Sequence, residues 1–541
     1  MTSGIVEVAP PANEPVNTYA PGTAEREALR TELQAVAGTT VEAPHIIGGQ
    51  ARPADTTFQV RAPHRRDLHL ADVHQATSRH VTQAIAAALD AGQDWARTPF
   101  EERAAVFLRA ADLLSGPWRN RINAATILGQ SKSWQQAEID AACEAIDFLR
   151  FNVAFARRVL ADQPLNVRGV WNRMDYRPLE GFVLAVTPFN FTAIALNLPT
   201  APALMGNTVV WKPSEKQALA AHWTMQLLAE AGLPPGVINL VHGDGALVSD
   251  VAMDDPNFAG LHFTGSSVVL QRLWSQAAQN LDRYRTFPRI VGESGGKDFV
   301  IAHPSAQVDA LVVALGRGAF EYQGQKCSAV SRAYIPHSLW GRVRDGIADL
   351  ASALPTGDVA DPRVFFGAVI DEAAFRKHAD AIAHATDAGA KALTGGGTND
   401  QDGWFVEPTV LVTEDPQSPT MTTELFGPVL TVFVYDDARW RETLDLVDAT
   451  GQYALTGSVF AQDRDAIAEA AVELRQAAGN FYINDKPTGA VVGQQPFGGA
   501  RRSGTNDKAG SALNLHRWVS PRTIKETFVP PTDWRYPHLD D

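Results

Sequence analysis

The sequence predicts an α/β protein with two doubly wound domains in tandem and a smaller hairpin-and-tail element beside them. From Gly181 onward, short apolar runs alternate with helix-compatible stretches, which is typical of a mostly parallel sheet covered on both faces. A second series with the same alternation begins near Arg289. The length of 541 residues also exceeds what one hydrophobic core usually supports.

The chain before the first series is predicted to hold an extended arm and several helices. The arm is rich in prolines, which disfavour a helix, at Pro10, Pro11, Pro15 and Pro21. Helical patterns follow at Thr23–Ala37, His80–Trp95, Glu101–Leu114 and Trp134–Leu160. The second of these stops near Pro99, because the residue before a proline avoids helical backbone.

Strands are expected where short apolar runs are bounded by turn residues. In the first series they are Phe182–Thr187, Thr208–Trp211, Val237–Val241 and Gly260–Phe263. In the second series they are Phe299–Ala302, Ala329–Ile335, Val429–Tyr435 and Ser458–Phe460. The polar, alternating segment Asn166–Arg177 predicts a protruding hairpin, and the tail from Pro521 is expected to dock on a partner surface.

These elements divide the chain into five parts. We expect an arm with helices of the first domain in 1–165, the hairpin in 166–177 and the first α/β domain in 178–290. The second α/β domain follows in 291–488, and 489–541 form a loop, a return segment and the tail. Because the hairpin and the tail expose backbone edges that usually need a partner, a homo-oligomer is expected, either a dimer or a higher assembly.

Composition excludes several classes of function. The net charge of −14 leaves no basic excess for nucleic-acid phosphates or for an anionic membrane. The longest apolar runs, such as Gly181–Val186, are far too short to span a bilayer. The 14 histidines and two cysteines show no metal-ligand spacing, so no metal site is expected. With so few cysteines and no secretory pattern in Met1–Thr18, the expected location is the cytoplasm.

One of the two cysteines, Cys327, lies in a segment that suits a nucleophile. It closely follows Gly324 and stands next to Lys326. A free thiol has a pKa of about 8.5, so roughly 3 % is thiolate at neutral pH, and a cation or backbone N–H groups would raise that fraction. The alternative is a buried, inert residue, and the segment alone does not decide between the two. The other cysteine, Cys143, falls on the apolar stripe of a predicted helix and is expected in the core.

Three further motifs stand out, and two of them lie at the ends of predicted strands. Thr187–Asn190 closes a strand, which puts Asn190 at the carboxyl end, where α/β sheets bind ligands. Phe263–Ser266 joins a strand to a helix, where free N–H groups and the helix dipole favour a pyrophosphate. Glu293–Lys297 presents a carboxylate on a glycine-rich turn. A complete G-x-G-x-x-G fingerprint and a P-loop are both missing from the sequence.

Together with Cys327, these motifs stand in an order that resembles the aldehyde dehydrogenase superfamily over nearly the whole chain. The shared motifs are Thr187-Pro-Phe-Asn190, Trp211-Lys-Pro-Ser-Glu215, Phe263-Thr-Gly-Ser266, Glu293-x-Gly-Gly-Lys297, Gly324-Gln-Lys-Cys327, Glu424-Leu-Phe-Gly-Pro428 and Pro496-Phe-Gly-Gly499. One departure is Ser294, where many members have leucine. The resemblance implies a Rossmann-like NAD-binding domain followed by a catalytic domain.

The resemblance also implies a role for each motif. Cys327 would attack an aldehyde carbon, and the Asn190 amide with the Cys327 backbone N–H would hold the oxyanion. Glu293 would activate the water that hydrolyses the resulting thioester. NAD is favoured over NADP, because Glu215 would repel a 2′-phosphate. The implied cofactor-binding residues are Lys212, Glu215, Gly265, Ser266, Glu424 and Phe426.

A closer resemblance is to the branch of this superfamily that oxidises L-glutamate γ-semialdehyde to L-glutamate in proline catabolism. It is carried by Asn484–Ala490, Gly493–Arg501 and Ser503–Lys508. It implies that the substrate is bound by Ser328, Gly489 and Ala490 at its carboxylate, by Phe191 and Phe497 along its chain and by Glu144 near its ammonium. From the residues alone, the phenylalanines have an alternative reading as core, and Glu144 has one as part of a solvated acidic face with Asp140 and Asp147.

Two other functions stay open from the sequence. A CoA-acylating semialdehyde dehydrogenase would share the chemistry, although such relatives generally lack a base equivalent to Glu293. A catalytically silent structural or regulatory homologue is the other alternative, and the intact Cys327, Glu293 and Asn190 argue against it. Contact with a separate proline dehydrogenase is also left open.

Overall fold

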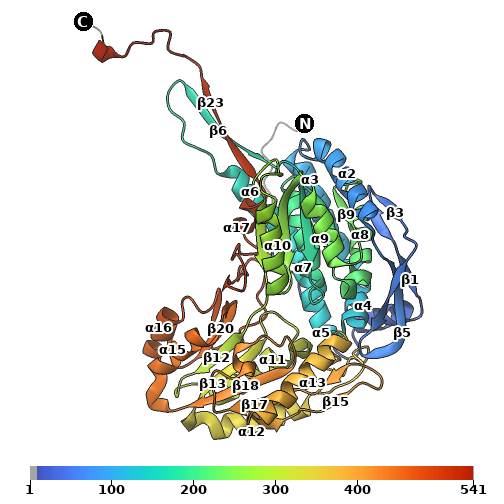
Figure 1. Cartoon of the computed structure of the whole chain (residues 1–541), viewed down its shortest axis with the longest axis vertical. Coiled ribbons are helices and arrows are strands. Elements are labelled where there is room, and N and C mark those ends of the chain that lie inside the picture. The colour runs from blue at the N-terminus through green and yellow to red at the C-terminus, as the bar shows by residue number, and fades with distance from the viewer. Residues whose placement is uncertain (1–8, 540–541) are drawn as a thin grey trace.

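The computed structural model describes residues 9–539, which form two seven-stranded sheets, one above the other in Figure 1. Both sheets are mostly parallel and carry helices on both faces. The predicted doubly wound α/β architecture is therefore confirmed. The predicted strands Phe182–Thr187 and Val429–Tyr435 have the same bounds in the structure.

The first sheet has the strand order β11-β10-β7-β8-β9-β2-β3. Its strands are β2 (His45–Ile47), β3 (Gln50–Arg52), β7 (Phe182–Thr187), β8 (Thr208–Pro213), β9 (Ile238–Leu240), β10 (Phe258–Thr264) and β11 (Arg289–Glu293). The strands from β11 to β9 run parallel, and β2 and β3 extend one edge in antiparallel pairs. Side chains alternate across a strand, so Leu184 of β7 enters one core while Val183 and Ala185 enter the other.

Helices bury both faces of this sheet. One face carries α2 (Ser78–Trp95), α9 (Gly245–Asp254) and α10 (Ser267–Gln279). The other carries α7 (Thr192–Leu204), against which pack α3 (Phe100–Ser115), α8 (Ala218–Glu230) and the continuous run of α5 (Trp134–Ala137), the π-helical turn η1 (Glu138–Cys143) and α6 (Glu144–Ala161). Further out lie α1 (Ala24–Ala37) and α4 (Arg119–Gln130), and η2 (Glu215–Gln217) precedes α8. The helix α4 was not predicted from the sequence.

The second sheet has the order β14-β17-β18-β13-β12-β20-β21. Its strands are β12 (Asp298–Ala302), β13 (Val330–Pro336), β14 (Lys391–Thr394), β17 (Thr409–Thr413), β18 (Val429–Tyr435), β20 (Thr456–Phe460) and β21 (Asn480–Ile483). Around it lie α11 (Val308–Phe320), η3 (Glu321–Gly324), α12 (His337–Ala353), α13 (Glu372–Asp387), α14 (Pro419–Thr422), η4 (Asp437–Arg439), α15 (Trp440–Thr450) and α16 (Arg464–Glu473). Short pairs flank it, β15 (Thr398–Asn399) with β16 (Phe405–Val406) and β19 (Tyr453–Ala454) with β22 (Ala500–Arg501).

A small sheet near the N-terminus was also not predicted. It has the order β1-β5-β4, with β1 (Val41–Ala43), β4 (Thr57–Ala62) and β5 (Arg65–His74). Its strands pack against α1 and α8. The predicted domain boundary after residue 290 falls inside β11, which pairs with β10 and therefore keeps Glu293 on the first sheet.

The predicted hairpin within Asn166–Arg177 is formed only in part, as an isolated antiparallel bridge between Val167 and Val170. This segment supplies one strand, β6 (Val170–Arg177), and its partner is β23 (Ser520–Thr527) from the other end of the chain. The two strands project together from the first domain (Figure 1). The alternating pattern identified a strand, but the sequence gives no local sign of a partner that lies so far away.

The return segment before β23 completes the core of the first domain. It contains α17 (Ala512–His516) and the fully buried Trp518. The centre of the indole lies 4.7 Å from that of the His262 ring, with the two planes tilted by 45°, and Asn207 Nδ2 donates to the Trp518 carbonyl at 2.9 Å. The chain ends with the short helix η5 (Pro537–Leu539). Within residues 9–539, no helix is long and apolar enough to cross a membrane.

Buried histidines make the fold sensitive to acid. Burial lowers the pKa of His45 to about 3 and that of His222 to about 4, and it lowers the pKa of His242 well below the usual range. His45 Nδ1 accepts the His242 backbone N–H at 3.1 Å, which joins β2 to the end of β9. Positive charge from the neighbouring His74, His80 and Lys212 side chains also lowers the pKa values of His45 and His242.

We therefore expect the stability of the wild type, relative to a His45→Gln variant, to fall as the pH is lowered from 7 to 4. The unfolded chain protonates His45 near pH 6.5, whereas the folded chain excludes that proton down to about pH 3. The free energy of unfolding of the wild type, relative to that of the variant, should therefore fall by about 1.4 kcal/mol for each pH unit below 6.5. Buried carboxyls such as Glu293 oppose this trend in both proteins, so the difference in melting temperature is the quantity to measure. A difference that stays constant from pH 7 to 4 would contradict the prediction.

Candidate active site

Cys327 lies just before β13 and lines two cavities. The first has a volume of about 510 Å³ and is bounded by the carboxyl ends of β7 and β10. The second lies between α6, α7 and the loop that contains Gly489. The thiol can therefore be reached by one molecule from each side.

The turn before Cys327 is held in a strained backbone conformation by buried side chains. Tyr322, Gln323 and Gly324 have successive φ values of +51°, +54° and +65°, in the left-handed region. The Gln323 amide donates to two backbone carbonyls of other segments, at 2.9 and 2.7 Å. A side chain at Gly324 would overlap the carbonyl of Gly427. The position of the thiol is thus fixed by contacts from several parts of the chain.

Asn190 faces this turn from the first domain. It follows the carboxyl end of β7 and is buried, with 4 % of its surface exposed. Its Nδ2 donates to the carbonyl of Gln325 at 3.0 Å. An amide carries two N–H donors, so the second one can serve an oxyanion that forms beside Cys327.

The Cys327 thiol is neutral in this environment. Burial raises its pKa well above the usual range, and the carboxyls of Glu293, Asp298 and Glu424 act in the same direction. Of the two groups that the sequence offered for promoting the thiolate, Lys326 has other partners. Its Nζ lies 3.5 Å from Asp140 and 3.6 Å from Glu321, so its charge is already paired. The Cys327 backbone N–H does favour the thiolate.

Glu293 ends β11 and lines the second cavity with Cys327. Burial raises the pKa of its carboxyl to about 8, and the negative charge of Asp507 contributes. The cation of Lys508 opposes this shift. Lys508 is fixed in place, because its Nζ donates to the carbonyls of Gly479 and Gly498, each at 2.8 Å. A carboxyl with a pKa near neutrality suits a general base.

The first cavity gathers five of the six residues predicted to bind a cofactor. They are Lys212, Gly265, Ser266, Glu424 and Phe426. Ser266 is the N-cap of α10, so backbone N–H groups point into the cavity there. The Glu424 carboxylate accepts the Gly296 N–H at 2.9 Å, and a side chain at Gly295 would overlap that carboxylate. These features fit a dinucleotide whose pyrophosphate lies at α10 and whose second ribose lies at Glu424.

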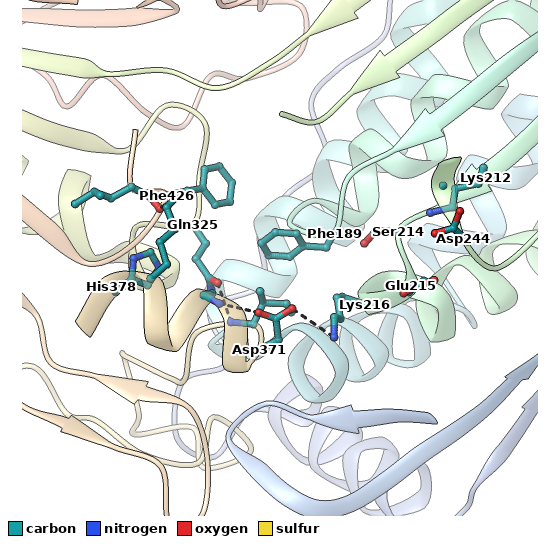
Figure 2. A pocket seen from close by; sticks show the side chains of 15 residues that line it. Phe189, Lys212, Ser214, Glu215, Lys216, Asp244, Gln325, Asp371, His378 and Phe426 are labelled. Atoms are coloured by element: carbon teal, nitrogen blue, oxygen red, sulfur yellow. Dashed lines mark hydrogen bonds and ion pairs between the residues drawn. The ribbon is translucent and has the colours of Figure 1, made fainter. Parts of the chain in front are cut away.

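Glu215 lies on an adjoining outer cavity of about 460 Å³, which Lys212 and Phe426 also line (Figure 2). Figure 2 shows Lys212, Glu215 and Asp244 on one side of this cavity, with Gln325, His378 and Phe426 on the other. An ion pair between Lys216 and Asp371, 3.4 Å long, joins the first domain to the second across it.

The second cavity brings together all six residues predicted to bind a substrate. They are Glu144, Phe191, Ser328, Gly489, Ala490 and Phe497. The two phenylalanines line the cavity rather than lying wholly in the core. Ser328 Oγ is 2.8 Å from Thr488 Oγ1, and Lys486 Nζ donates to the Thr488 carbonyl at 2.7 Å, so the loop is held at its start.

Comparison with known proteins assigns the family. The profile described as "Aldehyde dehydrogenase family" matches residues 51–524. The chain belongs to the aldehyde dehydrogenase family. A bovine relative named "Delta-1-pyrroline-5-carboxylate dehydrogenase, mitochondrial" is 50 % identical over 531 residues, 98 % of this chain and 94 % of that protein. The predicted resemblance to this family and to its branch is confirmed.

Solved structures of related proteins agree. The Delta-pyrroline-5-carboxylate dehydrogenase from Mycobacterium tuberculosis, bound with NAD, is 58 % identical and superposes with a TM-score of 0.97 over 100 % of both chains. Proline utilization A from Bdellovibrio bacteriovorus is 30 % identical, with a TM-score of 0.92 over 97 % of this chain and 54 % of that chain.

In this aldehyde dehydrogenase, the acidic residues around Glu144 do not form a solvated face. Asp140 and Asp147 are each only 4 % exposed. Asp140 accepts from Lys132 Nζ at 2.7 Å, and Lys132 also lies 4.1 Å from the centre of the Phe191 ring. Burial, followed by the charge of Asp140, raises the pKa of Glu144 well above its usual range.

The sequence reasoning did not identify Lys132 or the buried charges that it pairs with. Lys132 is fully buried, and so is the Tyr322 ring, 4.5 Å below its ammonium. The sequence gives little indication that Lys132 is buried, since a lysine between Ser131 and Ser133 is typical of an ordinary polar turn. Only the fold brings it against Asp140 and the wall of the second cavity.

Alkylation tests the neutral state of the thiol. We expect iodoacetamide to modify Cys327 and to leave Cys143 intact, because Cys143 lies in the core at 4 % exposure and its pKa is also raised by burial. The rate should rise about tenfold per unit from pH 7 to 9, since only the thiolate reacts. Mass spectrometry of the wild type and a Cys327→Ser control gives both site and rate. A rate that is independent of pH in this range would contradict the neutral thiol.

Proposed function

We propose that this chain catalyses the NAD-dependent oxidation of L-glutamate γ-semialdehyde, which forms from Δ1-pyrroline-5-carboxylate, to L-glutamate in proline catabolism. The observation that carries the proposal is the composition of the second cavity. Donors for a carboxylate (Ser328, Gly489, Ala490) and an acceptor for an ammonium (Glu144) share it with Cys327. The relatives named for this activity support the proposal over nearly their full lengths.

Substrate recognition follows from the chemistry of that cavity. The Ser328 hydroxyl and the backbone N–H groups of Gly489 and Ala490 bind the α-carboxylate. The aliphatic chain lies between Phe191 and Phe497, which leaves the aldehyde at the thiol. Glu144 accepts from the α-ammonium, whose positive charge favours the ionised carboxylate.

The residues around Cys327 perform the reaction in two stages. Sγ attacks the aldehyde carbon and releases its proton to solvent water, while the carbonyl oxygen becomes an oxyanion bound by Asn190 Nδ2 and the Cys327 N–H. NAD, when bound, accepts the hydride that leaves this carbon. The thioester on Sγ is then hydrolysed as Glu293 takes a proton from the attacking water, which releases glutamate and restores the thiol. Removing one oxyanion donor typically lowers the rate by ~10²–10³.

The cofactor residues are proposed to act at different parts of NAD. Lys212 and Glu215 bind the adenosine ribose, Gly265 and Ser266 the pyrophosphate, and Glu424 and Phe426 the nicotinamide end. Glu215 is expected to disfavour NADP by repulsion of its extra phosphate.

We further propose a homo-oligomer assembled through β6, β23 and the tail. Large apolar side chains are exposed there, at Trp171, Phe528, Val529 and Trp534. A transient contact with a separate proline dehydrogenase is proposed by analogy with proline utilization A. Both cysteines are free thiols, so the proposed location is the reducing cytoplasm, whereas the bovine relative is named mitochondrial.

An NADH assay tests the proposed function. Wild-type protein with NAD and pyrroline-5-carboxylate should form NADH with saturation kinetics, and Cys327→Ala should abolish it. Ser328→Ala should raise KM for this substrate by about tenfold, as expected when a hydrogen bond to a charged group is lost. Rapid turnover of a simple aliphatic aldehyde alongside negligible NADH from pyrroline-5-carboxylate would reject the substrate. A strict requirement for CoA would favour the acylating alternative.

The base can be tested separately by its pH dependence. Glu293 must be ionised to accept a proton, so thioester hydrolysis should accelerate with rising pH and level off above about pH 8. In Glu293→Gln, one burst of NADH per active site should be followed by slow turnover, because the thioester accumulates. Rapid-quench and mass spectrometric detection of the acyl-enzyme measure this. A Gln variant that turns over at the wild-type rate would exclude Glu293 as the base.

A further inference from the structure

The extended N-terminal arm crosses the back of the substrate cavity. Tyr19 anchors it, because its ring is buried and its hydroxyl donates to Glu138 Oε2 at 2.7 Å. Further along, the Glu14 carboxylate lies between Arg119 and Arg150 and is paired with both. These contacts fix the arm on α4, η1 and α6, and the last two of these elements line one wall of the cavity.

Asn13 joins this wall to the loop that follows Gly489. Its Nδ2 donates to Asp147 Oδ2 and to the Val492 carbonyl, each at 2.8 Å. Its Oδ1 accepts from Gln494 Nε2 at 2.9 Å. Both N–H donors and the oxygen of the side chain are therefore used in one bridge between α6 and the loop.

The Val492–Gln494 part of the loop makes few other polar contacts with the first domain. Gly493, with φ of +83°, packs directly against the Phe151 ring of α6. The Gln495 side chain, which lines the substrate cavity, accepts the Val491 N–H at 2.9 Å and so holds the loop only to itself. The Asn13 bridge is thus the main polar link from this part of the loop to the rest of the first domain, within residues 9–539.

The Asp147 carboxylate strengthens the bridge, because it is a charged acceptor for the Asn13 amide. It lies on α6 one turn after Glu144, and the Glu14 backbone N–H donates to it at 2.7 Å. Burial raises the pKa of Asp147 to about 6, and its hydrogen bonds from Asn13 and Glu14 favour the charged form. A hydrogen bond to an ionised partner is about twice as strong as one between neutral groups.

We propose that Asn13 is a positioning residue for substrate recognition, which aims the Gly489 and Ala490 N–H groups at the α-carboxylate by holding the Val492–Gln494 part of the loop. This inference rests on the proposed function. Backbone N–H groups have no rotamers of their own, so they can be aimed only by fixing the loop. Asn13 then contributes to specificity although it does not line the cavity. An aldehyde without an α-carboxylate does not use these N–H groups and is insensitive to the bridge.

The test compares two aldehydes in purified full-length protein. Asn13→Ala should raise KM for pyrroline-5-carboxylate by about 5–30-fold, the equivalent of losing one or two such hydrogen bonds. It should leave kcat, KM for NAD and kcat/KM for butanal within about twofold of the wild type. Gln494→Ala, which removes one of the three bonds from the loop side, should raise the same KM by about threefold. The double variant should be no worse than Asn13→Ala, because both changes break one bridge.

The controls separate positioning from folding. Val16→Ala changes an exposed arm residue, 45 % accessible, and should match the wild type in all constants. If Asn13→Ala fails to fold, Gln494→Ala decides, since it leaves Asp147 and the arm intact. An unchanged KM for pyrroline-5-carboxylate, or an equal loss with butanal and NAD, would overturn the inference. Wild-type protein with no activity on pyrroline-5-carboxylate would instead reject the proposed function.

Discussion

Access to one partly buried thiol from two sides is the constraint on which the rest of the structure depends. Two cavities meet at Cys327, and each takes its walls from both domains. A rigid backbone must therefore hold the thiol, which explains the left-handed turn at Tyr322–Gly324 and its buried glutamine clamp. Glycines near the cavities leave space that a side chain would fill. At Gly295, for example, a side chain would overlap the Glu424 carboxylate.

The buried charges explain how such a thiol can rest without reacting. Lys326, the adjacent cation, is paired with Asp140 and Glu321, so the carboxyls near Cys327 keep the sulfur protonated. A protonated thiol is a poorer target for oxidants than a thiolate. On the other side of the cavity, Lys132 is paired with Asp140, and the neighbouring Glu144 is the acceptor that we propose for an ammonium. The pairing of Lys326 and Lys132 with carboxylates therefore leaves Cys327 without a free cation beside it in the part of the chain that the structure describes.

The sequence predicted most of the site, because its residues lie at the ends of apolar strands that are easily recognised. Asn190 after β7 and Ser266 after β10 are of this kind, whereas Glu293 was identified from a glycine-rich turn, and the family resemblance supplied the roles. The failures have another physical origin. The partner of β6 and the Phe191 and Tyr322 rings beside Lys132 are set by how distant segments meet, which local patterns do not encode. Asp147 is another example, because the N-terminal arm covers it on α6 and no local pattern indicates that contact.

The return of the chain through Trp518 has a consequence for biosynthesis. This indole is a fully buried part of the first domain, against His262 of β10, but the ribosome makes it roughly 250 residues later. At 5–20 residues per second, the nascent first domain waits roughly 10–50 s for the residue that closes its core. During that interval the second domain emerges and has time to fold. The N-terminal unit, although first to be synthesised, is therefore the last to be completed.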